Sequence, residues 1–208
     1  MTTSSTSPPS SASAVDAPLA GTPVHVLWTA AADGDLRPIS EGPAPAPVPG
    51  DRAVRRLTQV HGGGVVVADA PVPSGTTPWV AGPGRLPPEG DAVVASGDAF
   101  ALLVLSADCA SVALGSPEGV HAAVHVGWRG LGADVLARAI DTVRDLGATE
   151  VVAGLGPCIG PCCYEFSPRD LDAVQATCPT EVVGTTTWGR PSLDLPAAVR
   201  GQLSRSGV

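Results

Sequence analysis

The amino-acid sequence, which is 208 residues long, predicts a single α+β domain. Short β-branched runs bounded by turn residues indicate strands, and three stretches have the apolar spacing or the capping residues of helices. Strands and helices do not alternate regularly, as they would in a parallel βαβ sheet, so the pattern favours the α+β class. The length is sufficient for one sizeable hydrophobic core.

The expected strands are short and most of them lie in the central half of the chain. One is expected at 24–29, and two more flank a glycine turn within 55–69. The other strands are placed at 91–96, 100–107, 111–116, 120–126 and 150–156.

Three helices are expected in the second half. Within 131–147, Leu131, Val135, Ala139, Ile140 and Val143 lie on one side at helical spacing, and Gly147 is a plausible C-terminal cap. The other two helices are expected within 166–179, with Ser167 as N-cap before Pro168, and within 194–207.

The polar segments define the expected domain limits. Residues 1–22 are rich in Ser, Thr and Pro and are expected to form a disordered tail, which leaves 23–208 as the catalytic domain. Residues 38–50 form an expected linker or loop, and 70–90 an expected long surface loop, because both are rich in Pro.

Composition excludes several classes of partner. The net charge is −8 and the chain has no lysine, which argues against nucleic acid or an anionic membrane because phosphate binding needs clustered cations. No apolar run approaches the roughly 18 residues that cross a bilayer. Five cysteines, an odd number, with no secretion signal before them, predict free thiols and a cytoplasmic location.

Three side chains stand at the ends of apolar runs, where catalytic groups are commonly presented. His61 and His125 each precede a glycine, and Cys109 closes the run 100–107 after Ser-Ala-Asp. Two imidazoles and a thiolate suit Zn²⁺, and three protein ligands would leave a fourth position open, as in catalytic sites. The same atoms fit a Cys109 nucleophile with His125 as its base, and sequence alone does not separate the two hypotheses.

Neighbouring residues have both structural and functional interpretations. Asp108 could orient a ligating histidine or cap a strand, and Arg129 could bind a phosphate or carboxylate or remain a surface cation. His25 and His121 are interpreted as packing or surface residues. The segment 154–166, "GLGPCIGPCCYEF", is either a structural turn or a wall of the pocket.

Five motifs in this order resemble the laccase-domain family, also called multicopper polyphenol oxidase-like or purine nucleoside phosphorylase-type proteins. The motifs are "QVHG" (59–62), "DAVVAS" (91–96), "SADC" (106–109), "HVGWRG" (125–130) and "GPCIGPCCYEF" (156–166).

The resemblance implies mixed β-sheets packed together and flanked by helices, within one domain. It implies zinc, with copper as the alternative, bound by His61, Cys109 and His125. From its place beside Cys109, Asp108 is added to the expected catalytic residues as support for these ligands. Arg129, Gln59 and Gly127 are assigned to substrate or phosphate. The implied reactions are phosphorolysis of adenosine, inosine and methylthioadenosine and deamination of adenosine, and the implied partners are small molecules, with a homodimer as one expectation.

Two departures from the family pattern leave an alternative open. The stretch 27–38 lacks the usual Arg-Gly-Gly and Asn-Leu-Gly motifs, and the sequence stops at Val208, before the usual final segment. A degenerate paralogue that binds metal without catalysis is therefore the main rival, followed by the Cys/His hydrolase. Copper-dependent phenol oxidation ranks lower, because four histidines are too few for several coppers.

Overall fold

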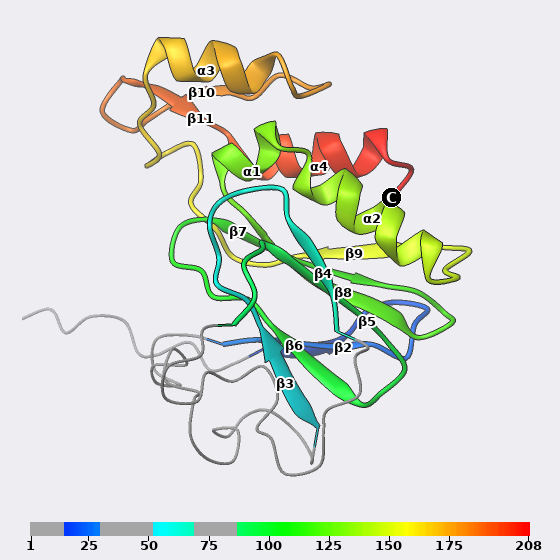
Figure 1. The fold of residues 1–208 in the computed structure, drawn as a ribbon. Coiled ribbons are helices and arrows are strands. Elements are labelled where there is room, and N and C mark those ends of the chain that lie inside the picture. Colours follow the sequence, from blue (N-terminus) through cyan, green and yellow to red (C-terminus); the bar gives the residue numbers. More distant parts are fainter. Residues whose placement is uncertain (1–14, 30–51, 69–86) are drawn as a thin grey trace, which may run out of the picture.

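The computed structural model describes residues 15–29, 52–68 and 87–208, and its centre is a five-stranded mixed sheet (Figure 1). The strand order is β4-β5-β8-β7-β9; β4 and β5 are parallel and the other neighbours are antiparallel. The strands are β4 (Val65–Val67), β5 (Ala92–Ser96), β7 (Ala110–Gly115), β8 (Val120–Val126) and β9 (Val152–Leu155).

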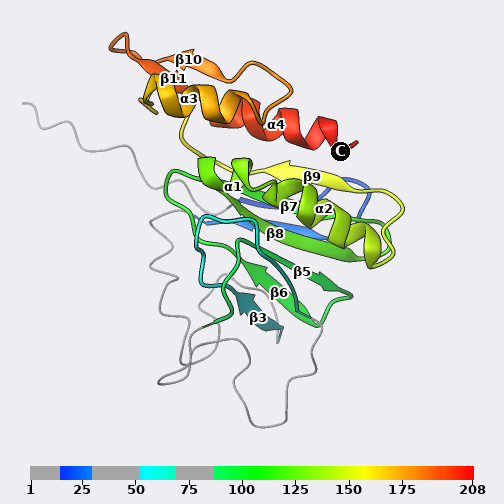
Figure 2. The same ribbon diagram turned by 45° about the horizontal axis from the view of Figure 1, so that its top comes forward.

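Helices cover one face of this sheet, as Figure 2 shows from a second angle. They are α1 (Trp128–Gly132), α2 (Val135–Asp145) and α4 (Leu195–Arg205). The main core lies between α2 and the strands, where Ile140 and Leu136 meet residues such as Val94 and Val124, all fully buried. The apolar spacing of α2 therefore marks its buried face, as predicted.

The opposite face of the sheet packs against further strands. β6 (Phe100–Leu103) pairs in parallel with β3 (Ala53–Arg56), and a second apolar cluster joins this pair to Val93 and Ala95. Because alternate residues of β5 face opposite sides, both faces of that strand are buried. Mixed sheets packed together and flanked by helices confirm the predicted fold class.

A hairpin of β1 (Val15–Pro18) and β2 (His25–Trp28) packs against one face of β7 and β9. A Cβ at Gly156 would lie 2.3 Å from the Trp28 ring, so the chain needs glycine there. β1 lies inside the segment expected to be a disordered tail, so the ordered chain begins earlier than predicted; residues 1–14 lie outside the described residues.

The C-terminal part adds an outer layer over α1 and α4. It contains α3 (Pro168–Gln175), which begins at the predicted Ser167 cap, and the hairpin of β10 (Val183–Thr185) and β11 (Pro191–Leu193). The prediction missed this hairpin, because its strands are three residues long and alternate apolar residues with Gly, Ser and Thr.

The predicted helix over 131–147 is wrong in one respect. It is two helices, α1 and α2, because Asp134 between them adopts the left-handed conformation with φ of 55°. The break lets α1 begin beside the end of β8. The expected linker at 38–50 and most of the expected loop at 70–90 lie outside the described residues.

Candidate metal centre

Three side chains from loops and strand ends meet at one end of the sheet: His61, Cys109 and His125. His61 lies between β3 and β4, Cys109 directly precedes β7, and His125 is the second-last residue of β8. Because β7 and β8 are paired, with Ser111 opposite His125, Cys109 and His125 end on the same side. One ligand atom from each of the three residues lies within 4.8 Å of the others.

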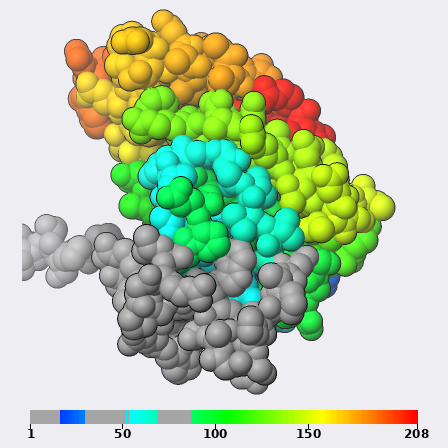
Figure 3. Space-filling model, in the orientation of Figure 1, coloured from blue at the N-terminus to red at the C-terminus, as the bar shows by residue number. Residues whose placement is uncertain are grey.

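This donor set fits a divalent metal ion. When three atoms are no more than 4.8 Å apart, an ion placed between them lies within about 3 Å of each atom. This distance is close to zinc bond lengths of about 2.0–2.3 Å. The two imidazole rings are 4.8 Å apart between centroids and nearly perpendicular, at 82°. His61 is exposed and His125 is buried, so the group sits at the boundary between core and solvent, and the 52–68 segment forms part of the surface in Figure 3.

A buried carboxylate, Asp91, supports both histidines, and sequence analysis did not single it out. Its Oδ1 accepts a hydrogen bond from His125 Nδ1 at 2.9 Å and another from the backbone N–H of His61 at 2.9 Å. Asp91 immediately precedes β5, within the quoted "DAVVAS" motif, so an acidic residue opening a buried strand was the available signal. Asp108, interpreted either as a residue that orients a histidine or as a strand cap, is exposed, and no imidazole hydrogen-bonds to its carboxylate in the described structure.

The protonation tendencies of the ligands favour metal binding over a free thiolate. Burial lowers the pKa of His125, although the hydrogen bond and charge of Asp91 oppose this shift, so the neutral imidazole is favoured. Burial raises the pKa of Cys109, and the negative charges of Asp108 and Asp91 raise it further. A bound cation would stabilise the thiolate that these carboxylates disfavour.

Gly127 and Gln59 lie at the centre, but their contacts are with protein atoms. A Cβ at Gly127 would lie 3.0 Å from His61 Cδ2 and 3.1 Å from Cys109 Sγ, so this residue packs against two of the three ligand side chains. The Gln59 amide donates to the Leu105 carbonyl at 2.7 Å and accepts from the Leu105 N–H at 2.8 Å. Gln59 thereby ties the His61 loop to the Cys109 loop.

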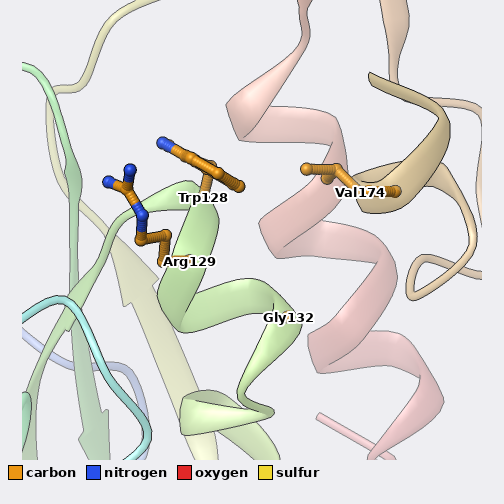
Figure 4. Close-up of a pocket in the computed structure, with 5 residues that line it drawn as sticks. Trp128, Arg129, Gly132 and Val174 are labelled. Atoms are coloured by element: carbon orange, nitrogen blue, oxygen red, sulfur yellow. The ribbon is translucent and has the colours of Figure 1, made fainter. Parts of the chain in front are cut away.

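Arg129 and Trp128 follow Gly127 and start α1, where they lie side by side (Figure 4). The Arg129 guanidinium stacks 4.3 Å from the centroid of the Trp128 ring. Both residues line a hollow of about 350 Å³, together with Gly132, Ala173 and Val174. Stacking holds the guanidinium plane while leaving its in-plane N–H groups directed outward.

The segment 154–166 lies beside the triad, joined to the Cys109 loop by a hydrogen bond from Ile159 N to Asp108 O at 2.9 Å. Burial raises the pKa of Tyr164, and the charges of Cys109 and Asp108 raise it further, so this phenol faces the same region. His25 and His121 do not join the triad, in agreement with their interpretation as packing or surface residues.

An α+β fold with a two-histidine, one-cysteine donor set at the end of a mixed sheet describes a candidate metal-dependent protein. Residues 46–208 match the family model for multi-copper polyphenol oxidoreductase laccase, and the chain therefore belongs to this family.

Relatives support the same assignment. A purine nucleoside phosphorylase of Streptomyces coelicolor is 41% identical over 155 residues, covering 73% of this chain and 60% of the relative. One from Streptomyces griseus is 34% identical over 183 residues, covering 82% of this chain and 70% of the relative. The crystal structure of YlmD from Geobacillus stearothermophilus is similar with a TM-score of 0.64 and 27% identity, covering 76% of this chain and 60% of that one.

The chain thus spans about 60% of the length of the Streptomyces coelicolor relative and of YlmD. In the described ranges, every helix is too short or too polar to cross a lipid bilayer.

Proposed function

We propose that this protein is a zinc-dependent enzyme that acts on purine nucleosides, by phosphorolysis of adenosine, inosine or methylthioadenosine. The observation that carries the proposal is the convergence of His61, Cys109 and His125, with the Arg129–Trp128 pair following shortly after His125 in the chain. Relatives that carry the name purine nucleoside phosphorylase support the substrate class.

The residues of the site suggest how the work is divided. A bound zinc ion would supply Lewis acidity. Arg129, held against Trp128, would bind the phosphate or another anion through its N–H groups, because a planar guanidinium matches such oxygens. The Trp128 ring and the hollow beside it offer an apolar surface for a planar base.

Hydrolytic deamination of adenosine is a second reaction of the same proposal, and it needs water in place of phosphate. Copper is the alternative metal, since thiolate and imidazole ligands also accept it. The Cys/His hydrolase is disfavoured, because a nucleophilic cysteine needs a lowered pKa and the pKa of Cys109 is raised. The degenerate paralogue remains the rival that activity measurements decide.

The test is an incubation of zinc-loaded protein with adenosine, inosine and methylthioadenosine, with and without phosphate. Phosphorolysis releases the free base and ribose 1-phosphate (its methylthio analogue from methylthioadenosine) only with phosphate, whereas deamination yields inosine and ammonia without it. Cys109→Ala should abolish turnover, and Cys162→Ala, which removes an exposed thiol from the 154–166 segment, serves as the matched control. A fully metal-loaded protein that leaves all three nucleosides unchanged would disprove the proposal.

A further inference from the structure

Asp91 receives more hydrogen bonds than its position in the sequence suggests. Its carboxylate, which is fully buried, accepts from His125 Nδ1 and from three successive backbone N–H groups. Those groups belong to Val60 at 3.3 Å, His61 at 2.9 Å and Gly62 at 2.7 Å. Successive N–H groups that converge in this way form a concave anion-binding arrangement, and here the protein's own carboxylate fills it.

The hydrogen bonds to Asp91 indicate the tautomer of His125. The backbone N–H groups of Val60, His61 and Gly62 can only donate, so both carboxylate oxygens act as acceptors toward them. His125 Nδ1 lies 2.9 Å from one of these acceptor oxygens, and we therefore assign it the ring hydrogen. In the neutral ring this leaves the Nε2 lone pair for a metal ion.

The same carboxylate holds His61 in an unusual backbone conformation. His61 has a φ of 59°, in the left-handed region that costs a non-glycine residue about 1–2 kcal/mol. The residue keeps this conformation where its own N–H and that of Gly62 both point at Asp91. Backbone bonds strengthen the link, because His125 N donates to Asp91 O at 2.7 Å and Asp91 N donates to Gly64 O at 2.9 Å.

We infer that Asp91 is a positioning residue that fixes the ring of His125 and the backbone of His61 for the metal before any metal binds. It sets the tautomer of His125 and the backbone conformation from which the His61 side chain leaves, so this part of the centre is already formed in the metal-free protein. This inference rests on the proposed metal-dependent function only for its consequence on metal affinity, not for its statement about the histidine tautomer.

The first experiment is ¹⁵N NMR of the histidine rings in the metal-free wild-type protein. It is carried out at a pH high enough for the His125 ring to be neutral. The signal of His125 is assigned by its loss in His125→Gln, since the chain has four histidines. The expected result is a protonated Nδ1 and an unprotonated Nε2. A hydrogen on Nε2 would overturn the inference, whatever the protein does with nucleosides.

The second experiment compares Asp91→Asn with Asp141→Asn, which removes the same charge from the exposed face of α2. In Asp91→Asn an NH₂ group, which cannot accept a hydrogen bond, replaces one of the two oxygens that accept them. His125 should therefore switch toward the tautomer that carries its hydrogen on Nε2. Zinc affinity should then fall by about 10–100-fold. Zinc affinity is measured by competition with a chromophoric chelator, and folding by circular dichroism.

Asp141→Asn should retain the wild-type tautomer and affinity. A folded Asp91→Asn protein with wild-type zinc affinity would overturn the inference. If Asp91→Asn does not fold, the tautomer of His125 in the wild-type protein still tests the inference. A wild-type tautomer as expected in a protein without nucleoside activity would refute the proposed function and leave this inference intact.

Discussion

The two sides of the candidate metal centre are held in different ways. On the imidazole side, His61 and His125 share a fully buried carboxylate with four hydrogen bonds. On the thiol side, Cys109 is half-buried, its carbonyl accepts a hydrogen bond from Ser106 Oγ, and the adjacent Asp108 carboxylate is exposed. The imidazole side is therefore anchored to the core through Asp91 and His125, and the thiol side is carried by a surface loop.

This difference teaches how geometry and charge are divided in the site. The buried side fixes ligand direction, because satisfied buried hydrogen bonds are costly to break. On the loop side, burial and the nearby negative charge raise the pKa of Cys109, so the thiolate is disfavoured until a cation binds and stabilises it. The following changes test this division, from the largest expected effect to the smallest.

Removal of one ligand from each side should have the same effect on metal binding and different effects on folding. Both Cys109→Ala and His125→Ala should weaken zinc binding by more than the roughly 10–100-fold cost of changing an outer residue. In the metal-free protein, His125→Ala should lower the free energy of unfolding by about 1–3 kcal/mol, because it leaves a buried acceptor short of a donor. Cys109→Ala should cost less than about 1 kcal/mol.

Chelator competition and urea unfolding of the metal-free proteins measure the two quantities. Equal losses of stability in both variants would contradict the contrast between a core-built side and a loop-carried side.

Gly127→Ala should disturb both sides at once. Its methyl group would lie 3.0 Å from His61 Cδ2 and 3.1 Å from Cys109 Sγ, so both ligand side chains must shift away from the methyl group. We expect a zinc affinity about tenfold lower, within the range for changes that reorient ligands. Gly132→Ala, at the last residue of the helix that Gly127 precedes, is the matched control, because a Cβ there meets no atom within 4 Å. An equal zinc affinity in both variants would show that the His61 and Cys109 side chains can shift without weakening metal binding.

Gln59→Ala should loosen the link between the two sides. The Leu105 N–H and carbonyl would each lose a partner, at a cost of about 1 kcal/mol in the free energy of unfolding. Zinc affinity should fall less than in Gly127→Ala, since no ligand side chain is displaced. Thermal unfolding with and without zinc measures both effects, and a variant as stable as the wild type would remove Gln59 from the positioning network.

Asp108→Asn should change the reactivity of Cys109 in the metal-free protein. Removing a negative charge lowers the pKa of the thiol, so more thiolate is present at a given pH below that pKa. For a charge exposed to solvent we expect alkylation of Cys109 to become about two- to fivefold faster near pH 8. Mass spectrometry of the peptide that contains Cys109 follows the rate. A slower reaction would mean that Asp108 does not act through its charge.

Much of the fold was accessible from the sequence because it depends on local patterns. A short β-branched run bounded by turn residues predicted β8, the capping residue Ser167 marked the start of α3, and the spacing in 131–147 identified the buried side of α2. The break at Asp134 was not accessible, since a single left-handed residue leaves the apolar spacing almost unchanged. Strand β1 was missed because its pairing partner, β2, and not its composition makes it a strand.

For the candidate site, the sequence by itself determined which residue types were available: His61, Cys109 and His125, each at the end of an apolar run. Chain position says where a side chain leaves a strand. It does not say which distant groups that side chain will meet, because the sheet order β4-β5-β8-β7-β9 differs from the order along the chain.

Only the tertiary structure decided the supporting contacts. It brought Asp91 under both histidines, turned Gln59 toward Leu105, and placed Gly127 against two ligand side chains. The physical reason is that hydrogen bonds and van der Waals contacts act over a few ångströms in space, whereas the hydrogen-bonded partners are separated by about 30 or more residues in the chain.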